Sequence, residues 1–350
     1  MTRPCMPSGP IPARIMIVGE APGHEEERVG APFVGASGNE LTKMLTEAGI
    51  NRSQCFITNV IRIRPPNNDL WAFIAQTKGK VTSSHVPLRD RMVMRCVVDG
   101  VKLLKQEILS CNPNVIIAVG NCSMWSLTGK WGITDWRGSI LPCDLVPGYK
   151  VLCTYHPAAI MRQWSWRTVL VQDLRRAARE SAFREIRTPK WNFLLRPTIG
   201  QVLETIQRLI DRANSGPTVL SVDIETSLHF ITCIGLAWNR TEAICIPFTC
   251  SDDDYGYWSL DEETIIVWNL RRLLTHPNIQ VLGQNFLYDT QHIYRWWGFI
   301  PHFYCDTMFS QHVCFVGMPK SLDFQSSIYS EYYQYWKDRS IYDNVEKRDA

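Results

Sequence analysis

The feature that most constrains the fold is a regular alternation of short apolar segments with longer amphipathic ones. In the first half of the chain, the amphipathic segments carry apolar residues at helical spacing and predict helices over 39–50, 98–111 and 167–183. Buried strands are predicted over 13–20, 55–61, 114–120 and 150–157. Such alternation is typical of an α/β fold with a mostly parallel sheet and helices on both faces.

The second half begins with a predicted helix and then has three consecutive strands before helices and strands alternate again. The strands are expected over 218–226, 231–238, 242–248 and 279–284, and the helices over 200–216, 260–276 and 287–298. An antiparallel meander followed by alternation is how ribonuclease-H-like α/β sheets begin. We therefore expect a second α/β domain that differs from the first.

Two stretches do not fit these patterns. The segment 67–95 is long, polar and mixed, and is predicted to be an insertion loop. The segment 184–199 is predicted to be a linker that contains a short strand. The expected domains are therefore 1–183 and 200–350, and a length of 350 residues is enough for two cores.

Charge and cysteine content limit the classes of function. Residues 1–190 hold 25 basic and 15 acidic residues, a net charge of +10, whereas the rest of the chain carries −7. The basic half suits a polyanion, and the acidic half suits bound cations or a solvated surface. The 12 cysteines include no CxxC pair and are expected to be reduced thiols of a cytoplasmic protein.

Neither a membrane span nor a secretion signal is predicted. No apolar run reaches the ~18–20 residues that cross a bilayer. Pro10, Pro12 and Arg14 interrupt any signal-peptide core near the N-terminus. The expected place of action is the cytoplasm.

Polar residues follow the predicted strands of the first half, where ligands bind in parallel sheets. The first strand runs into GEAPG (19–23), whose Gly19, Ala21 and Gly23 allow backbone N–H groups to approach a ligand. Glu20 and Glu26 lie within or just after this turn, and Phe33 stands between Pro32 and Gly35. Asn59 and His156 end two further strands. Together these residues predict a polar site with one aromatic wall.

The same residues resemble the uracil-DNA glycosylase superfamily, and most closely its family 4 and the related domain fused to some phage DNA polymerases. The resemblance covers about residues 13–182 and includes GEAPG, PFVG, ITNV followed by RIRPPNN, VIIAVG, ITDWRG and YHPAAIMR. It implies a three-layer α/β/α domain that excises uracil from single- or double-stranded DNA.

The resemblance also implies roles for single residues. Glu20 and Glu26 would place the attacking water and shape the pocket, and Phe33 would stack on the flipped uracil. Asn59 would bind the polar edge of uracil, and His156 would stabilise the negative charge on the departing base. Met161, Arg162 and Gln163 would form a wedge that fills the vacated stack.

Two positions depart from the family pattern. Ala21 stands where the classical enzymes have an aspartate, so any activation of water falls to Glu20 or Glu26. The family 4 enzymes hold a four-cysteine iron–sulfur cluster, whereas this chain has Cys5, Ile63 and only an approximate match at Cys96. We predict that no iron–sulfur cluster is bound.

A second set of carboxylates lies in the second half. Asp223 and Glu225 occupy alternate positions of one strand and therefore share a face. Asn285 and Asp289 follow in GQNFLYD. These motifs resemble the proofreading 3′–5′ exonuclease domains of family A DNA polymerases. The resemblance implies that Asp223, Glu225 and Asp289 bind Mg²⁺ or Mn²⁺ for phosphodiester hydrolysis.

The third motif of that family, Tyr-x3-Asp, is absent after residue 320. The site is therefore expected to be incomplete, and the chain to be the N-terminal part of a DNA polymerase whose polymerase domain is missing. Asp338 and Asp343 are weaker substitutes for the missing ligand. Two alternatives stay open: an inactive uracil- or DNA-binding module that steers the polymerase, and a stand-alone repair nuclease.

Overall fold

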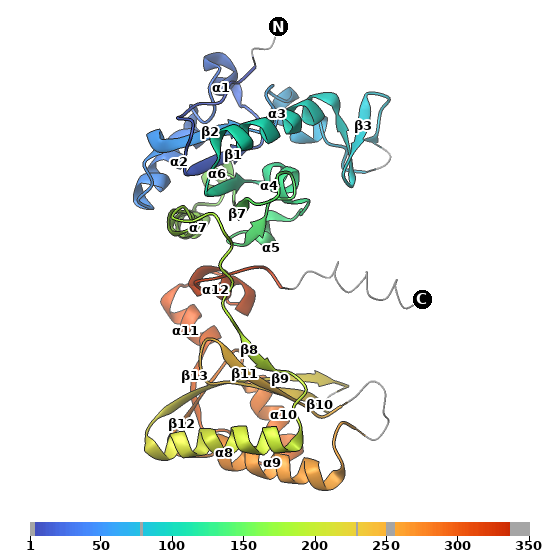
Figure 1. The fold of residues 1–350 in the computed structure, drawn as a ribbon, viewed down its shortest axis with the longest axis vertical. Helices are drawn as coiled ribbons and strands as arrows, with labels where there is room; N and C mark the ends of the chain where they lie inside the picture. Colours follow the sequence, from blue (N-terminus) through green and yellow to red (C-terminus); the bar gives the residue numbers. More distant parts are fainter. Residues whose placement is uncertain (1–3, 78–79, 229, 250–255, 337–350) are drawn as a thin grey trace. The chain divides into compact units, whose positions relative to one another are not determined.

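The computed structural model describes residues 4–77, 80–228, 230–249 and 256–336 (Figure 1). The chain forms two compact units. The first unit consists of Met1–Arg187 and Asp323–Ala350, and the second unit is Thr188–Leu322. Each unit is an α/β structure built around its own sheet.

The first unit has a five-stranded sheet in the order β2-β1-β5-β7-β6. Its strands are β1 (Ile15–Gly19), β2 (Cys55–Asn59), β5 (Val115–Val119), β7 (Lys150–Thr154) and β6 (Ile140–Pro142). The first four are mutually parallel and every residue in them is buried, as their continuous apolar runs predict. The short edge strand β6 is antiparallel and was not predicted.

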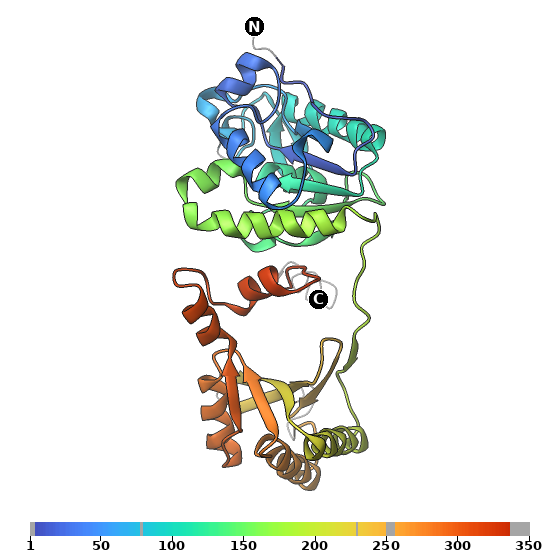
Figure 2. The same cartoon turned by 90° about the vertical axis from the view of Figure 1, so that its left-hand side faces the viewer.

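Helices cover both faces of this sheet. Helices α2 (Ala36–Glu47), α6 (Pro157–Arg162) and α7 (Arg167–Glu180) lie side by side (Figure 2). Helices α3 (Arg95–Cys111) and α4 (Asn121–Thr128) pack on strands β2 and β5. The usual right-handed crossover between parallel strands predicts that they cover the opposite face. Two short helices, α1 (His24–Val29) and α5 (Ile133–Trp136), complete the layers. The resulting α/β/α arrangement is the predicted one.

The segment 67–95 was predicted to be a loop, and this is wrong in part. It contains the short helical turns η2 (Pro66–Asn68) and η3 (Leu70–Ala72) and a hairpin of β3 (His85–Leu88) and β4 (Arg91–Met94). The hairpin escaped prediction because its four-residue strands are half-polar and one contains Pro87. The turns are tied to the hairpin by a bridge between Ile74 and Val93.

The second unit has a six-stranded sheet in the order β13-β12-β9-β10-β11-β8. Its strands are β8 (Asn192–Leu194), β9 (Thr218–Ser227), β10 (Phe230–Ala237), β11 (Glu242–Pro247), β12 (Ile279–Gly283) and β13 (Phe303–Asp306). Strands β9, β10 and β11 form the predicted antiparallel meander, and β12 is parallel to β9. This is the strand order of a ribonuclease-H-like sheet.

Helices α8 (Ile199–Ser215) and α9 (Leu260–Leu274) lie side by side against one face of this sheet (Figure 1). Both begin with a capping box, formed by Thr198 with Gln201 and by Ser259 with Glu262. Helices α10 (Leu287–Trp297) and α11 (Thr307–Cys314) follow, and α12 (Leu322–Tyr329) begins the segment that belongs with the first unit. The apolar faces of α8, α9 and β9 form the core of this unit.

Residues 323–336 belong with the first unit, whereas the sequence analysis included them in the second domain, expected over 200–350. The buried Arg137 side chain donates hydrogen bonds to Asp173 and to the Ser327 hydroxyl. Arg176 donates to the Ser327 carbonyl (2.9 Å). The Ile140 amide of the edge strand donates to the Tyr333 carbonyl (3.1 Å). This segment therefore covers the β6 edge and two buried guanidinium groups.

Asp338 and Asp343, the weaker candidates for the missing metal ligand, lie outside the described residues.

Within the described part of the chain, no helix combines the length and the apolar character that crossing a membrane requires.

Candidate functional site

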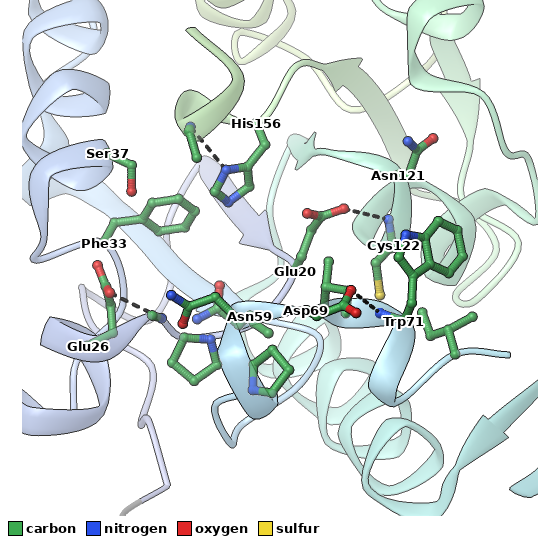
Figure 3. Close-up of a pocket in the computed structure, with 18 of the residues that line it drawn as sticks. Glu20, Glu26, Phe33, Ser37, Asn59, Asp69, Trp71, Asn121, Cys122 and His156 are labelled. Carbon is green, nitrogen blue, oxygen red and sulfur yellow. Dashed lines mark hydrogen bonds between the residues drawn. The ribbon is translucent and has the colours of Figure 1, made fainter. Parts of the chain in front are cut away.

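The first unit has a pocket of about 550 Å³ at the carboxyl ends of its parallel strands (Figure 3). Its lining combines residues that follow β1 and β2 with the first residues of α4 and α6. The lining residues that matter for its chemistry are Glu20, Ala21, Gly23, Glu26, Phe33, Asn59, Trp71, Asn121, Cys122, Trp131, His156 and Arg162. The topology thus brings together the predicted polar residues that follow three different strands.

Phe33 and Asn59 form one end of this pocket. Asn59 is the last residue of β2 and is buried. The Phe33 backbone adopts φ 52°, a left-handed conformation that is rare for a bulky residue and marks a constrained site. Arg52 stabilises it by donating to the Phe33 carbonyl (2.8 Å). The Phe33 ring lies 5.8 Å from the His156 ring, with an angle of 30° between the ring planes.

Gly19 lies beneath this end of the pocket and is not among the residues that line it. A Cβ at Gly19 would come within 2.3 Å of Asn59 Oδ1 and 2.6 Å of the Phe33 ring. We expect Gly19→Ala to displace both side chains and to lower kcat/KM for the substrate of this site on the order of 100-fold. Steady-state kinetics measure this effect. Gly200→Ala is the control, because a Cβ there would meet only Thr198 Oγ1 at 3.9 Å. An unchanged kcat/KM in Gly19→Ala would contradict the packing described.

His156 is fixed at the N-terminus of α6, where its Nδ1 accepts a hydrogen bond from the Ala158 amide (3.2 Å). Burial lowers the pKa of His156 to about 4, and the nearby Glu26 carboxylate opposes this only in part. The ring is therefore neutral at neutral pH. Since Nδ1 is the acceptor, the proton resides on Nε2, which is left as a hydrogen-bond donor.

The Glu26 carboxylate is used to build the pocket wall. Its Oε1 accepts from the Val34 amide (3.1 Å) and the Gly35 amide (2.8 Å), and its Oε2 accepts from the Gly23 amide (3.2 Å). These bonds tie the turn after β1 to the loop that carries Phe33. From the sequence, Glu26 was expected to place the attacking water and to shape the pocket. These hydrogen bonds favour the role in shaping the pocket.

Glu20 follows β1 directly and lies between the Phe33–His156 end of the pocket and Trp71 in Figure 3. Its Oε1 accepts from the Cys122 amide at the start of α4 (2.9 Å). Burial raises the pKa of Glu20 to about 7, although hydrogen bonds from the Cys122 and Asn121 amides oppose the shift. A carboxylate with such a pKa can take up a proton near neutral pH.

The remaining predicted residues are placed at the rim or outside. Ala21, Gly23 and Arg162 line the pocket. Met161 and Gln163 lie at the end of α6, are exposed, and are not among the lining residues. The predicted wedge of Met161, Arg162 and Gln163 stays a prediction.

Sequence reasoning missed the other end of the pocket, which is lined by Trp71, Trp131 and residues around Asp69. Trp71 lies in the segment that was predicted to be a loop. Trp131 precedes the short helix α5. Both tryptophans were visible in the sequence, but neither belongs to a periodic pattern that could have assigned it to the site.

In the second unit, Asp223 and Glu225 lie on the same face of β9, and both are exposed there. Asp289 Oδ1 accepts from the Ile224 amide (2.9 Å). Burial, together with Asp223 and Asp306, raises the pKa of Asp289 to about 6. The described residues nevertheless include no group of three His, Cys, Asp or Glu side chains placed to hold a metal ion. The predicted metal site at Asp223, Glu225 and Asp289 therefore stays a prediction.

The predicted absence of an iron–sulfur cluster stays a prediction. In the structure, Cys5 is buried and its amide donates to the Arg62 carbonyl (2.8 Å). Burial raises the pKa of the Cys5 thiol to about 11, so that thiolate formation is disfavoured.

Comparison with known proteins identifies a family for residues 6–184. The model of the uracil DNA glycosylase superfamily matches residues 6–184. The type-4 uracil-DNA glycosylase of Thermotoga maritima is 37% identical over 174 residues, which cover 48% of this chain and 78% of that protein. The DNA polymerase of Bacillus phage SP01 is 26% identical over 231 residues, 64% of this chain but only 22% of the polymerase.

Solved structures also share similarity with this chain. Escherichia coli RNase D, an exoribonuclease involved in structured RNA processing, matches with a TM-score of 0.31 and 16% identity, over 43% of this chain and 36% of that one. The apo form of a nuclease matches with a TM-score of 0.30 and 12% identity, over 43% of this chain and 65% of that one. The chain thus spans less than two thirds of either structure.

Proposed function

This chain belongs to the uracil DNA glycosylase superfamily, and on that basis we propose that its first unit removes uracil from DNA by hydrolysing the N-glycosidic bond. The observation that carries the proposal is the convergence of Glu20, Phe33, Asn59 and His156 on one pocket. The type-4 relatives support the same chemistry.

Base recognition follows from the geometry at the Phe33 end of the pocket. A uracil must leave the base stack to enter, which costs a few kcal/mol. Stacking on the Phe33 ring offsets part of that cost. The Asn59 amide has both a donor and an acceptor, and it can therefore pair with the polar edge of uracil but not with that of cytosine in the same orientation.

Bond cleavage needs stabilisation of negative charge on the departing base. The Nε2–H of neutral His156 is fixed by the Ala158 contact and can donate to a uracil oxygen as charge develops there. Glu20 is the carboxylate available to hold the attacking water, because both Glu26 oxygens accept backbone N–H groups. The water then adds to the sugar carbon as the bond to uracil breaks, and Glu20 receives its proton.

The pKa of Glu20 gives this mechanism a pH dependence. Since burial raises that pKa to about 7, the carboxylate fraction, and with it the rate of uracil release, should rise as the pH increases through about 7. Glu20→Gln should lower the rate and remove this rise. His156, with its pKa of about 4, contributes no change in this range. Single-turnover rates between pH 5 and 9 measure the profile, and an identical rise in Glu20→Gln would contradict the role of Glu20.

Binding of the DNA backbone is assigned to the basic half of the chain, whose net charge is +10 over residues 1–190. Arg162 stands at the rim of the pocket, and Met161 and Gln163 are exposed beside it. We propose that these three residues fill the space that the flipped uracil leaves in the stack. The substrate is uracil-containing DNA, single- or double-stranded.

For the second unit we propose a 3′–5′ exonuclease ancestry with a weak metal-dependent activity. Asp223 and Glu225 fit a platform for Mg²⁺ or Mn²⁺, because two carboxylates share one exposed face. Asp289 fits only in part, since one of its oxygens accepts the Ile224 amide, and we derive no catalytic step through the metal. Nuclease assays on 5′-labelled single strands with and without Mg²⁺ test this proposal, with Asp223→Ala as the inactive reference.

We further propose that the chain acts together with a DNA polymerase domain. The match to the phage polymerase supports this. The matched region is 231 residues long, which is longer than Met1–Arg187, and it therefore extends beyond that segment. Uracil removal and proofreading would then act on the DNA that the polymerase copies, in the cytoplasm.

A further inference from the structure

The tryptophan end of the pocket has no role in the chemistry proposed above. A volume of about 550 Å³ lies in the range that accommodates ligands larger than one pyrimidine ring. Phe33, Asn59 and His156 occupy one end, Glu20 lies in the middle, and Trp71 lies beyond Glu20 (Figure 3). The far end is therefore a second, aromatic compartment next to the place assigned to uracil.

Trp131 forms the fixed part of this compartment. The Arg91 guanidinium lies 3.8 Å from the centre of its ring, and the Trp125 ring meets it edge-on at 6.4 Å. Trp125 is itself held, because its Nε1 donates to Asp90 Oδ1 (2.7 Å). The Trp131 ring thus has little freedom to reorient.

Trp71 forms the exposed part, with 39% of its surface accessible and its ring 5.7 Å from that of Trp131. Its amide donates to Asp69 Oδ1 (3.0 Å), which caps the helical turn η3. The strand β4 holds this segment, since the Met94 amide donates to the Phe73 carbonyl (2.8 Å). A partly exposed indole on a backbone anchored in this way is a preorganised surface for stacking.

We propose that Trp71 and Trp131 form a second base-binding subsite, which stacks the nucleobase adjacent to the flipped uracil in single-stranded DNA. The assignment to the neighbouring nucleotide rests on the proposed glycosylase function. Stacking on exposed indoles is tolerant of base identity and is the usual way in which proteins bind single strands. The charged groups beside the indoles, Asp69 and Arg91, have opposite signs, which favours a base over a phosphate.

The experiment compares three single-stranded substrates that contain one uracil. One has normal neighbours, one lacks the base on the 5′ side of the uracil, and one lacks the base on the 3′ side; a tetrahydrofuran residue replaces the missing nucleoside. For the wild type, one of the two missing bases should lower kcat/KM about tenfold, as expected when a base loses its aromatic partner.

Trp71→Ala should lower kcat/KM on the normal substrate by a similar factor and abolish the difference between the three substrates. Trp71→Phe should retain most of the difference, which separates loss of stacking from misfolding. Trp268→Ala is the matched control, since Trp268 is an exposed tryptophan of α9 in the second unit. If Trp71→Ala lowered kcat/KM equally on all three substrates, or did not lower it at all, the proposed subsite would be contradicted.

A binding measurement separates the failure of this proposal from the failure of the glycosylase proposal. If no uracil is released from any substrate, fluorescence anisotropy still compares a uracil-free oligothymidylate with an abasic strand of equal length. The subsite predicts tighter binding of the oligothymidylate and loss of that preference in Trp71→Ala. Equal binding of the two strands by the wild type would exclude it.

Discussion

His156→Ala is expected to slow uracil release by about 100- to 1,000-fold, the usual cost of removing one donor that stabilises a developing anion. The physical reason is the loss of the Nε2–H group that the Ala158 contact directs away from α6 and leaves free to donate. Binding of uracil-containing DNA should change much less, because Phe33 and Asn59 stay in place. Single-turnover kinetics together with anisotropy measure the two effects separately.

Two variants control for the other role of His156, which is to cap α6. His156→Asn keeps a good N-cap side chain but is too short to place a donor at the same point. It should be as inactive as His156→Ala. His24→Ala removes an exposed histidine of α1 and should leave the rate unchanged. Near-normal activity of His156→Asn would contradict the assignment of His156 as the anion-stabilising donor.

Arg137→Leu is expected to lower the free energy of unfolding of the first unit by about 3–5 kcal/mol, as breaking a buried ion pair does. Arg137 and Asp173 are almost completely buried, and the Arg137 Nε donates to Asp173 Oδ2 (3.1 Å). The Asp173 carboxylate accepts hydrogen bonds from the Arg137 guanidinium and from the Thr154 hydroxyl (2.8 Å). Without the guanidinium, it keeps only the bond from Thr154 among these. The variant also removes the hydrogen bond that the Ser327 hydroxyl accepts from Arg137, and it should loosen residues 323–336.

Hydrogen exchange of the β5 and β7 amides in urea measures this effect in the first unit alone. Arg28→Ala is the control, because Arg28 pairs with Glu25 on the exposed surface and should cause no measurable change. The protection of these amides in Arg137→Lys should lie between that in Arg137→Leu and that in the wild type, since lysine keeps the charge but not the bidentate geometry. Unchanged protection in Arg137→Leu would contradict the structural role of this pair.

The sheet strands and most long helices could be predicted from the sequence, because buried strands have continuous apolar runs and buried helix faces have apolar residues at helical spacing. Strand β5 is apolar throughout, and the helix α8 presents Val202, Ile206 and Leu209 on one face. The hairpin after β2 and the docking of residues 323–336 could not be predicted. Arg137 and Arg176 look like surface residues in the sequence, because their contacts with Ser327 come from 190 and 151 residues away along the chain.

The sequence could indicate which of the candidate residues lie together, because the carboxyl ends of parallel strands meet at one edge of the sheet. Asn59 and His156 needed no more than this topology to be placed in the same pocket. The division of labour between Glu20 and Glu26 depended on backbone hydrogen bonds to the loop at Val34 and Gly35, which no residue pattern encodes. The same holds for Trp71, whose ring is placed by the anchoring of a non-periodic segment.

The most direct test of the central claim uses a 5′-labelled single-stranded oligonucleotide with one uracil, incubated with this chain in excess EDTA and then treated with alkali. EDTA removes the metal that a nuclease would need, so a break can arise only from a base that was excised without metal. We predict a break at the uracil that is absent with His156→Ala and Asn59→Ala. An intact strand, with tight binding of the same oligonucleotide, would contradict excision and leave the first unit as a module that binds uracil or DNA.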